Sequence, residues 1–341
     1  MSADSGASTK FWTDKKVLVT GGAGFIGGHL VERLLDLGAS VSVADNIRSG
    51  HLSRPRDERV RFLSDDLLEP ESCQLACHEI DVVFNAAAKV AGVGYNSAHP
   101  GEMFYRNSVI NLNMLDAARK SDVARFVVFS SACVYQHDAP VPTSEENGFI
   151  GDPEPTNFGY GWAKRLAEVQ ARAYASEYGM KISIIRPYNS YGPWDHFDDS
   201  AGHVIPNLIR KINSDPGELV VWGSGKQRRS FVYVSDLVEG LVLSPERYPI
   251  PDPVNVGSEE ETTIAELTDM IMRLSGQRIP VKFDLTKPEG QLRRKPDLQK
   301  ARKLLGYSPK VPLEQGLSLT LNWYGKHIKG LEVPVPKAHQ R

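Results

Sequence analysis

Short runs of apolar residues alternate, along the first half of the chain, with longer stretches in which apolar residues recur every three or four positions. The runs are VLVT (17–20), VSVAD (41–45), VRFLSDD (60–66), DVVFNAAA (81–88), RFVVFSS (125–131) and KISIIRP (181–187). Runs that are apolar throughout are typical of strands buried on both faces. Strands that alternate with helices predict an α/β fold, a doubly wound parallel sheet with helices on both sides, over residues 14–188.

The pattern changes after Asn189. Pro and Gly become frequent, and short strand-like pieces (ELVVWG, RSFVYV, DPVNVG) are mixed with helical ones such as TIAELTDMIMRLSG. This predicts a smaller mixed α/β domain over residues 189–330, packed on the first, with some later segments returning to it. Residues 1–13 and 331–341 lack periodicity, so we predict disordered tails there.

Charge and cysteine usage exclude several classes of protein. The 341 residues include 40 Lys and Arg against 42 Asp and Glu, a net charge of −2, whereas nucleic-acid binders usually carry a basic excess. No apolar run reaches the roughly 18 residues of a membrane span, and the polar opening MSADSGASTK is no secretory signal. Three cysteines do not make a disulfide scaffold, and the pair Cys73 and Cys77 lacks further metal ligands. We expect a cytoplasmic globular protein without a metal site.

Three glycines, Gly21, Gly24 and Gly27, follow the first predicted strand and open the first predicted helix. Backbone N–H groups at such a helix start can approach a pyrophosphate, which a Cβ would hold away. The strand before, the helix after and a second strand all lie within about 30 residues. This context favours a dinucleotide-binding, Rossmann-type sheet over a plain glycine turn.

Asp45 closes the second predicted strand, 18 positions after Gly27. A carboxylate there can accept hydrogen bonds from both ribose hydroxyls of an adenosine and would repel a 2′-phosphate, which favours NAD over NADP. Two alternatives stay open. Asp45 could be a solvated turn acid, and the nearby Arg48 could accommodate a 2′-phosphate.

Tyr160 and Lys164 lie four positions apart on a predicted helix, so their side chains share one face. An unperturbed phenol titrates near pH ~10. A neighbouring ammonium, together with an oxidised nicotinamide ring, stabilises the phenolate and makes it a usable base. Ser131, at the end of another predicted strand, could hold the substrate oxygen beside the tyrosine. YxxxK alone is common on protein surfaces, and only the glycine loop makes it informative.

Five motifs in this order resemble the extended short-chain dehydrogenase/reductases of the NAD-dependent epimerase/dehydratase family. The motifs are GGAGFIG (21–27), NAAA (85–88), SSACVY (130–135), YxxxK (160–164) and RPYNSYGP (186–193), and the resemblance runs from Lys16 to Tyr324. It implies an enzyme that acts on a nucleotide-sugar, with Ser131, Tyr160 and Lys164 as the catalytic triad and Asn107 in a structural role. It also implies a homodimer formed by the helices that carry Asn107 and Tyr160.

The same resemblance implies two sets of binding residues. The cofactor contacts are Gly21, Gly24, Phe25, Ile26, Gly27, Asp45, Asn46, Arg48, Asp66, Leu67, Ala86, Ala87, Ala88, Lys89, Tyr160, Lys164 and Tyr188. The substrate contacts are Lys89, Ser131, Cys133, Asn189, His203, Val204, Gln227, Arg229 and Arg293. Arginine suits a diphosphate because its planar fork binds two oxygens at once.

Within the family the chain resembles the GDP-L-fucose synthase and GDP-mannose 3,5-epimerase group. Dehydratases of the family typically have Glu two residues after the serine, where this chain has Cys133, and HVIP (203–206) matches the fucose synthase motif. The resemblance implies that Cys133 and His203 move protons at C3 and C5 of the sugar. A ketone at C4 acidifies both positions. A histidine with a pKa of about 6.5 suits the acid role, and the thiol needs a cationic neighbour. Otherwise Cys133 is a small buried hydrophobe and His203 caps a helix.

The sequence hypothesis is therefore an NAD-dependent nucleotide-sugar epimerase, with a GDP-sugar favoured. It would oxidise C4 transiently, epimerise C3 and/or C5 and return the hydride. The alternatives are an NADPH-dependent epimerase/reductase that acts on a 4-keto sugar, a 4-epimerase, and, more remotely, a non-catalytic dinucleotide-binding sensor.

Overall fold

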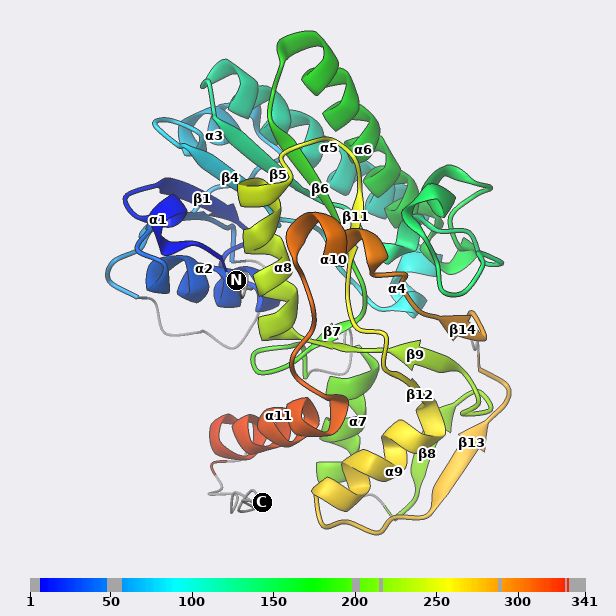
Figure 1. The fold of residues 1–341 in the computed structure, drawn as a ribbon. Helices are drawn as coiled ribbons and strands as arrows, with labels where there is room; N and C mark the ends of the chain where they lie inside the picture. The colour runs from blue at the N-terminus through cyan, green and yellow to red at the C-terminus, as the bar shows by residue number, and fades with distance from the viewer. Residues whose placement is uncertain are drawn as a thin grey trace.

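A computed structural model describes residues 7–47, 57–197, 203–214, 217–287, 290–328 and 330. The central sheet of these residues has seven parallel strands in the order β11-β6-β5-β4-β1-β2-β3 (Figure 1). The strands are β1 (Lys16–Thr20), β2 (Ser40–Ala44), β3 (Arg61–Leu63), β4 (Val82–Asn85), β5 (Arg125–Phe129), β6 (Ile182–Pro187) and β11 (Val254–Val256). The predicted α/β fold is confirmed.

Helices cover both faces of this sheet and enclose two separate cores. On β1, Val17 and Val19 point into one core and Leu18 into the other, because successive strand residues face opposite sides. The first core is closed by α2 (Phe25–Asp36), α8 (Val234–Arg247) and α10 (Gln299–Leu305), and the second by α3 (Pro70–Ala76), α5 (Pro100–Lys120) and α6 (Phe158–Tyr178). This two-sided burial explains why the predicted strands are apolar throughout.

The beginning of the chain differs from the prediction. Residues 1–6 lie outside the described part, as do residues 331–341, but Thr9–Trp12 form a short helix, α1. The Trp12 side chain is fully buried and packs on Phe84 of β4, with ring centroids 5.8 Å apart. The expectation of a disordered tail is therefore wrong for residues 7–13, because the buried area of one indole outweighs the polar character of the segment.

The segment DPVNVG was expected in the smaller domain but belongs to the main sheet. Its three strand residues, Val254–Val256, are all buried and form β11, which pairs in parallel with β6 at the edge of the main sheet. α8 and α10 pack beside it. These are the later segments that return to the first domain.

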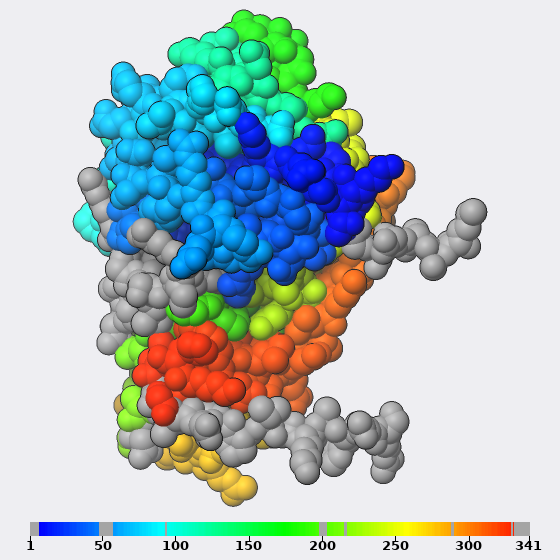
Figure 2. Space-filling view, turned by 90° about the vertical axis from the view of Figure 1, so that its left-hand side faces the viewer, coloured from blue at the N-terminus to red at the C-terminus, as the bar shows by residue number. Residues whose placement is uncertain are grey.

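Among the described residues, the smaller region contains three helices and several short sheets. Its helices are α7 (Val204–Asn213), α9 (Ile264–Leu274) and α11 (Leu313–His327). β8 (Leu219–Trp222) pairs with β13 (Val281–Asp284), and β9 (Arg228–Ser230) lies between β12 (Glu261–Thr263) and β14 (Arg293–Arg294). A third core holds these elements together, and α9 starts at a capping box formed by Thr263 and Glu266. In Figure 2, α11 (red) lies below the N-terminal segments (blue).

The carboxyl ends of the parallel strands face this smaller region. From β6 the chain enters β7 (Ser190–Tyr191), which pairs with β10 (Val232–Tyr233) below the main sheet (Figure 1). Ligands of open parallel sheets bind at this edge. Among the described residues no helix is long and apolar enough to cross a bilayer.

Candidate active site

The glycine loop between β1 and α2 has a geometry that side chains would prevent. Gly21 has a φ of +67°, and a Cβ there would lie 2.9 Å from Cα of Ala87. A Cβ on Gly27 would lie 2.1 Å from the carbonyl oxygen of Gly21. Gly24 is the N-cap of α2 and no side chain caps this helix end, so first-turn amide groups, at Phe25, Ile26 and Gly27, are left for a ligand. Such a helix end fits a pyrophosphate.

Asp45 lies next to this loop, at the end of β2. Its Oδ2 accepts a hydrogen bond from the backbone N–H of Ala23 at 3.0 Å, and its Oδ1 accepts one from Ile47 at 2.8 Å. The half-buried carboxylate therefore joins the second strand to the glycine loop, where a ribose would lie if a dinucleotide occupied the helix end. Asn46 beside it is half-buried as well, while Arg48 lies outside the described residues.

The segment after β4 forms the neighbouring wall. Residues Ala86–Lys89 are half-buried, and the Ala87 N–H donates to the Thr20 hydroxyl at 3.0 Å. Fully buried Asn107 accepts from the Lys89 N–H at 3.0 Å and donates to its carbonyl at 3.1 Å. Asn107 thus has the structural role that the resemblance implied.

Three of the predicted cofactor residues have side chains that pack inside the protein or accept a hydrogen bond within a turn. Leu67 is 4% exposed and lies in the second core, and Asp66 accepts a hydrogen bond from Leu68 N–H at 3.2 Å. Tyr188 is 3% exposed, packs on Tyr135 with centroids 6.3 Å apart, and donates its N–H to Val256 at 2.9 Å. The side chains of Leu67 and Tyr188 are buried, so we expect their backbone groups, and not their side chains, to face a cofactor.

The structure brings Ser131, Cys133, Tyr160 and Lys164 together. Ser131 is the N-cap of the short helix η1 (Ala132–Val134), and its Oγ accepts from the Cys133 N–H at 3.1 Å. Its hydroxyl also forms a hydrogen bond with the Tyr160 phenol. Lys164 Nζ lies 5.4 Å from the centroid of the Tyr160 ring and donates to the Phe129 carbonyl at 2.7 Å. A strand end and one helix face thus assemble the cluster.

Burial dominates the electrostatics of this cluster. It raises the pKa of Tyr160, an effect reinforced by the Cys133 charge and opposed by the Ser131 hydrogen bond. Burial lowers the pKa of Lys164 to about 8, although the Cys133 charge opposes this. The lysine alone therefore does not make the phenol a base, and the positive nicotinamide ring included in the sequence argument is needed.

A group of polar and charged residues that the sequence did not predict lies within electrostatic range of the cysteine. Arg294 pairs with Glu154 at 2.5 Å and donates from Nε to Gln291 at 2.6 Å. Burial lowers the pKa of Arg294, but the charges of Cys133 and Glu154 raise it more, so the guanidinium lies within electrostatic range of the thiol.

Arg293 and Arg294 lie on opposite faces of β14. The predicted substrate residue Arg293 forms a two-pronged ion pair with Glu261, at 2.7 and 2.6 Å, and its side chain is 47% exposed. Strand alternation separates the two arginines. A two-residue strand carries no periodic pattern from which the sequence could have shown which one points inward.

Arg229 on β9 is the cation next to this group. Its pKa is lowered to about 10 by burial and by the neighbouring Arg294 charge, while Glu154 opposes the shift. The two arginines and one glutamate leave an excess positive charge here. Gln227, 4% exposed, has a buried Oε1 without a hydrogen-bond partner among the described residues.

The other predicted substrate residues lie where β7 and α7 begin. The Asn189 carbonyl accepts from the Val232 N–H at 2.9 Å. Val204, the first residue of α7, packs partly on the third core. His203 is the N-cap of α7, and its Nδ1 lies 3.1 Å from Oδ1 of buried Asp195.

His203 and Asp195 form a second pair of titratable side chains. Burial lowers the pKa of His203, but the Asp195 charge and hydrogen bond raise it more, so the net shift is upward. Its side chain is 44% exposed. Among the described residues its recorded partners are Asp195 and His196, and none joins it to the Ser131 cluster.

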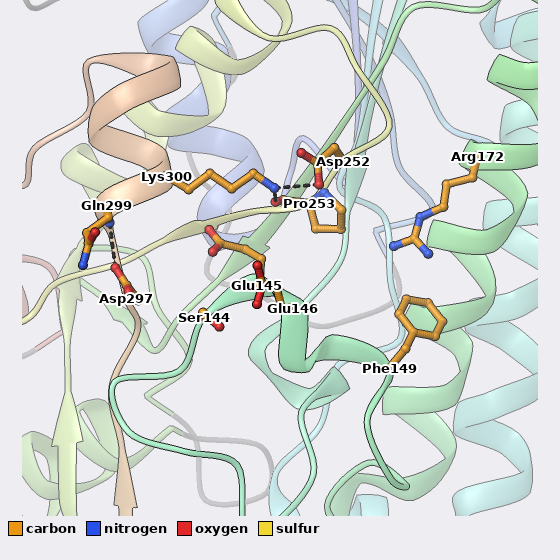
Figure 3. A pocket seen from close by; sticks show the side chains of 10 residues that line it. All are labelled: Ser144, Glu145, Glu146, Phe149, Arg172, Asp252, Pro253, Asp297, Gln299 and Lys300. Carbon is orange, nitrogen blue, oxygen red and sulfur yellow. Dashed lines mark hydrogen bonds and ion pairs between the residues drawn. The ribbon is translucent and has the colours of Figure 1, made fainter.

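A cavity of about 540 Å³ lies elsewhere, beside the outer part of α6 and the starts of β11 and α10 (Figure 3). The helix η2 (Glu145–Phe149) forms one side, and the ion pair of Lys300 with Asp252, at 2.6 Å, lies across it. None of the predicted site residues lines it, so it is separate from the candidate active site.

Comparisons with known proteins identify the family. The model of the NAD dependent epimerase/dehydratase family matches residues 17–257. The chain is 34% identical to "Probable GDP-L-fucose synthase 1" of Oryza sativa subsp. japonica, over 96% of this chain and 97% of that protein. It is also 34% identical to UDP-glucuronic acid decarboxylase 1 of Xenopus tropicalis, over 95% of this chain and 76% of that protein.

Among solved structures, UDP-glucose 4-epimerase of Thermotoga maritima, determined with UDP-glucose, superposes with a TM-score of 0.81. It is 29% identical and covers 92% of this chain and 99% of its own. Related proteins are nucleotide-sugar epimerases, dehydratases and reductases. The chain therefore belongs to the NAD-dependent epimerase/dehydratase family and is an enzyme of the nucleotide-sugar class.

Proposed function

We propose that this protein is an NAD-dependent nucleotide-sugar epimerase, which oxidises C4 transiently, inverts C3 and/or C5 and then reduces C4 again. A GDP-sugar is the favoured substrate. The observation that carries the proposal is the half-exposed thiol of Cys133, which shares one cluster with Tyr160 and Lys164. A thiol in this place can exchange a proton with a carbon next to the one that loses the hydride.

The chain's own groups fit a dinucleotide at the α2 helix end. The uncapped first turn would hold the pyrophosphate, and Asp45 would accept from the ribose hydroxyls. The carboxylate is the reason to propose NAD rather than NADP. Bound NAD would accept the hydride from C4 and later return it.

Tyr160 is the proposed base for the C4 hydroxyl proton. Its hydrogen bond to Ser131 places the phenol beside a second hydroxyl that can hold the same substrate oxygen. Lys164 is held below the phenol ring by the Phe129 carbonyl. Its ammonium stabilises the phenolate once the proton has moved.

Cys133 is the proposed base for the carbon acid. With a ketone at C4, the C–H bonds at C3 and C5 become more acidic, because the carbanion delocalises into an enolate. A thiolate takes one proton, and the His203 imidazolium supplies another from the opposite face. Two cations, Lys164 and Arg294, interact with the charge of Cys133 and are the cationic neighbours that such a thiol needs.

Arg229 and Arg294 are the proposed diphosphate contacts. They share a single buried counter-charge, Glu154, so a bound diphosphate would balance the excess positive charge. Arg293 is not retained in this role, because Glu261 already occupies its guanidinium.

A second candidate is an epimerase/reductase that consumes NADPH and acts on a 4-keto sugar. The 34% identity to a protein named as a GDP-L-fucose synthase favours it. A third, the 4-epimerase, is favoured by the structural match to UDP-glucose 4-epimerase. Turnover without added nicotinamide supports an epimerase with retained NAD, whereas strict dependence on NADPH supports the reductase.

The test is solvent exchange in heavy water with GDP-mannose, UDP-glucose and other nucleotide-sugars. We expect deuterium at C3 or C5 of the substrate. Cys133→Ala should abolish this exchange and keep reduction of the bound nicotinamide. Cys73→Ala, at a buried position of α3 within the second core, is the control. Exchange that survives Cys133→Ala would remove the cysteine from the mechanism, and inversion at C4 alone would favour the 4-epimerase.

The homodimer is a further part of the proposal. α5 exposes Tyr105 (63%) and Leu112 (40%), and neighbouring α6 exposes Phe158 (46%) and Val169 (48%). Two such helices from each of two copies would bury these side chains as a four-helix interface. Light scattering should give a dimer that Val169→Glu weakens, and a monomeric wild type would contradict this.

A further inference from the structure

Asp195 is a buried carboxylate to which the proposed reaction gives no role. It is 2% exposed and follows the loop that leaves β7. Its Oδ1 accepts from the His196 N–H at 2.8 Å and lies 3.1 Å from Nδ1 of His203. Its Oδ2 is buried without a hydrogen-bond partner among the described residues. An unsatisfied buried oxygen is destabilising, so a purely structural role does not account for this carboxylate.

The hydrogen bond decides which nitrogen of His203 is available for chemistry. An ionised carboxylate can only accept, so Nδ1 must be the donor. The second ring nitrogen, Nε2, is then left as the group that gives or takes a proton. The side chain is 44% exposed, so a proton lost from Nε2 can be replaced from solvent after each turnover.

Asp195 is also the charge that governs the protonation of His203. The described groups around the imidazole are Asp195 and the His196 ring, whose centroid is 6.3 Å away. α7 has its basic residues in the last turn, at Arg210 and Lys211, away from its N-cap. Among the described residues, the Asp195 carboxylate is the one charge that shifts the pKa of His203.

We propose that Asp195 is a positioning residue for His203, which holds Nδ1–H and keeps Nε2 protonated for delivery to the substrate carbanion. The inference rests on the proposed function. In the step, the Cys133 thiolate removes a proton from the carbon beside the ketone and the His203 imidazolium adds one to its other face. The thiol then holds the removed proton and the imidazole has lost its own, and solvent restores both groups without a change of oxidation state.

The test is the pH dependence of deuterium exchange into a GDP-4-keto-6-deoxyhexose, which enters after the hydride step. In Asp195→Asn the negative charge is lost, the pKa of His203 falls, and its acid form disappears at lower pH. We expect the alkaline limb of exchange to move down by about one pH unit, with roughly tenfold slower exchange above it and an unchanged KM. Asp252→Asn, at the surface ion pair with Lys300, should leave the limb in place.

His203→Asn separates this inference from the proposed function. If that variant loses exchange while Asp195→Asn keeps the wild-type limb, the positioning role is overturned and the proposed function stands. If His203→Asn exchanges normally, both the role of His203 and the inference fail. The double variant should lose no more of the exchange rate than His203→Asn loses alone.

A second measurement needs no substitution of Asp195. Nitrogen NMR of histidine-labelled protein, with His203→Asn for assignment, reports the tautomer of neutral His203. We expect the proton on Nδ1. A proton on Nε2 would overturn the inference even if the Asp195 variant failed to fold.

Discussion

The two proposed acid–base centres, a hydride centre at Tyr160 and Lys164 and a proton centre at Cys133 and His203, are built in different ways. Tyr160 and Lys164 lie on one helix, α6, beside a strand end, and Lys164 is 2% exposed. His203 is half-exposed and caps α7 in the smaller region. The hydride centre is therefore held by the main sheet alone, whereas the proton centre needs Cys133 from one region and His203 from the other. Geometry within a packed sheet is over-determined, while geometry between the two regions depends on the side-chain and loop contacts that join them, such as Arg294 with Glu154.

One such contact joins the regions directly. His29 is on α2, just after the glycine loop, and its Nε2 lies 2.9 Å from the carbonyl oxygen of Pro193. Pro193 is two residues before Asp195. The helix that would bind the pyrophosphate thus contacts the loop that carries Asp195.

The largest expected effect breaks the hydride centre without moving it. Tyr160→Phe keeps the buried ring and removes the base, so reduction of the bound nicotinamide should slow by about 10³–10⁴-fold. Stopped-flow absorbance of the reduced nicotinamide measures this. Because a 4-keto substrate bypasses the step, exchange at C3 or C5 should persist in the variant. Loss of both activities would show that the centres are not separable.

The next effect tests how rigidly the sheet holds its centre. Glu168 on α6 is fully buried and pairs with Arg186 of β6 at 2.7 Å, while Ser130 also donates to it. Glu168→Ala leaves the Arg186 charge buried and unpaired, which should cost about 3–5 kcal/mol of unfolding free energy in a urea titration. Glu314→Ala, which breaks the exposed pair with Arg273 in the smaller region, should change stability little. Equal losses would contradict the contrast between the regions.

A smaller effect separates two arginines of the β9–β14 sheet. Arg229→Ala removes a half-buried cation with a lowered pKa, and charge-assisted hydrogen bonds are worth about 1.5–3 kcal/mol, so the KM for a nucleotide-sugar should rise roughly 10- to 100-fold. Arg293→Ala removes an exposed partner of Glu261 and should leave KM within about twofold. Isothermal titration with GDP checks both. The reverse order would restore the role first assigned to Arg293.

The sequence predicted more of the first region than of the second for a physical reason. Five mostly buried strands, β1, β2, β4, β5 and β6, and a glycine loop with a steric requirement leave clear patterns, so these strands lie where the apolar runs are. The edge strand β3 is partly exposed but also lies in its predicted run. Trp12 was missed because one buried indole in a polar segment has no period. Arg294, Glu154 and Asp195 were missed because each acts through partners far away in the chain, or across a short irregular loop, where no spacing rule applies.

The smallest effect concerns pH and sharpens the contrast between the two centres. Burial lowers the pKa of Lys164 to about 8, so its ammonium is present below that pH and is lost as pH rises through it. The cation stabilises the Tyr160 phenolate, and kcat/KM reports groups of the free enzyme. For a nucleotide-sugar with a hydroxyl at C4, kcat/KM should therefore fall about tenfold per pH unit above pH 8. A 4-keto substrate needs no phenolate for exchange, so the alkaline limb of its exchange rate should follow His203 and move in Asp195→Asn. The limb that follows Lys164, seen with the C4-hydroxyl substrate, should not move in that variant. A single limb shared by both substrates, and moved by Asp195→Asn in both, would mean that one group governs the two steps and that the centres act as one.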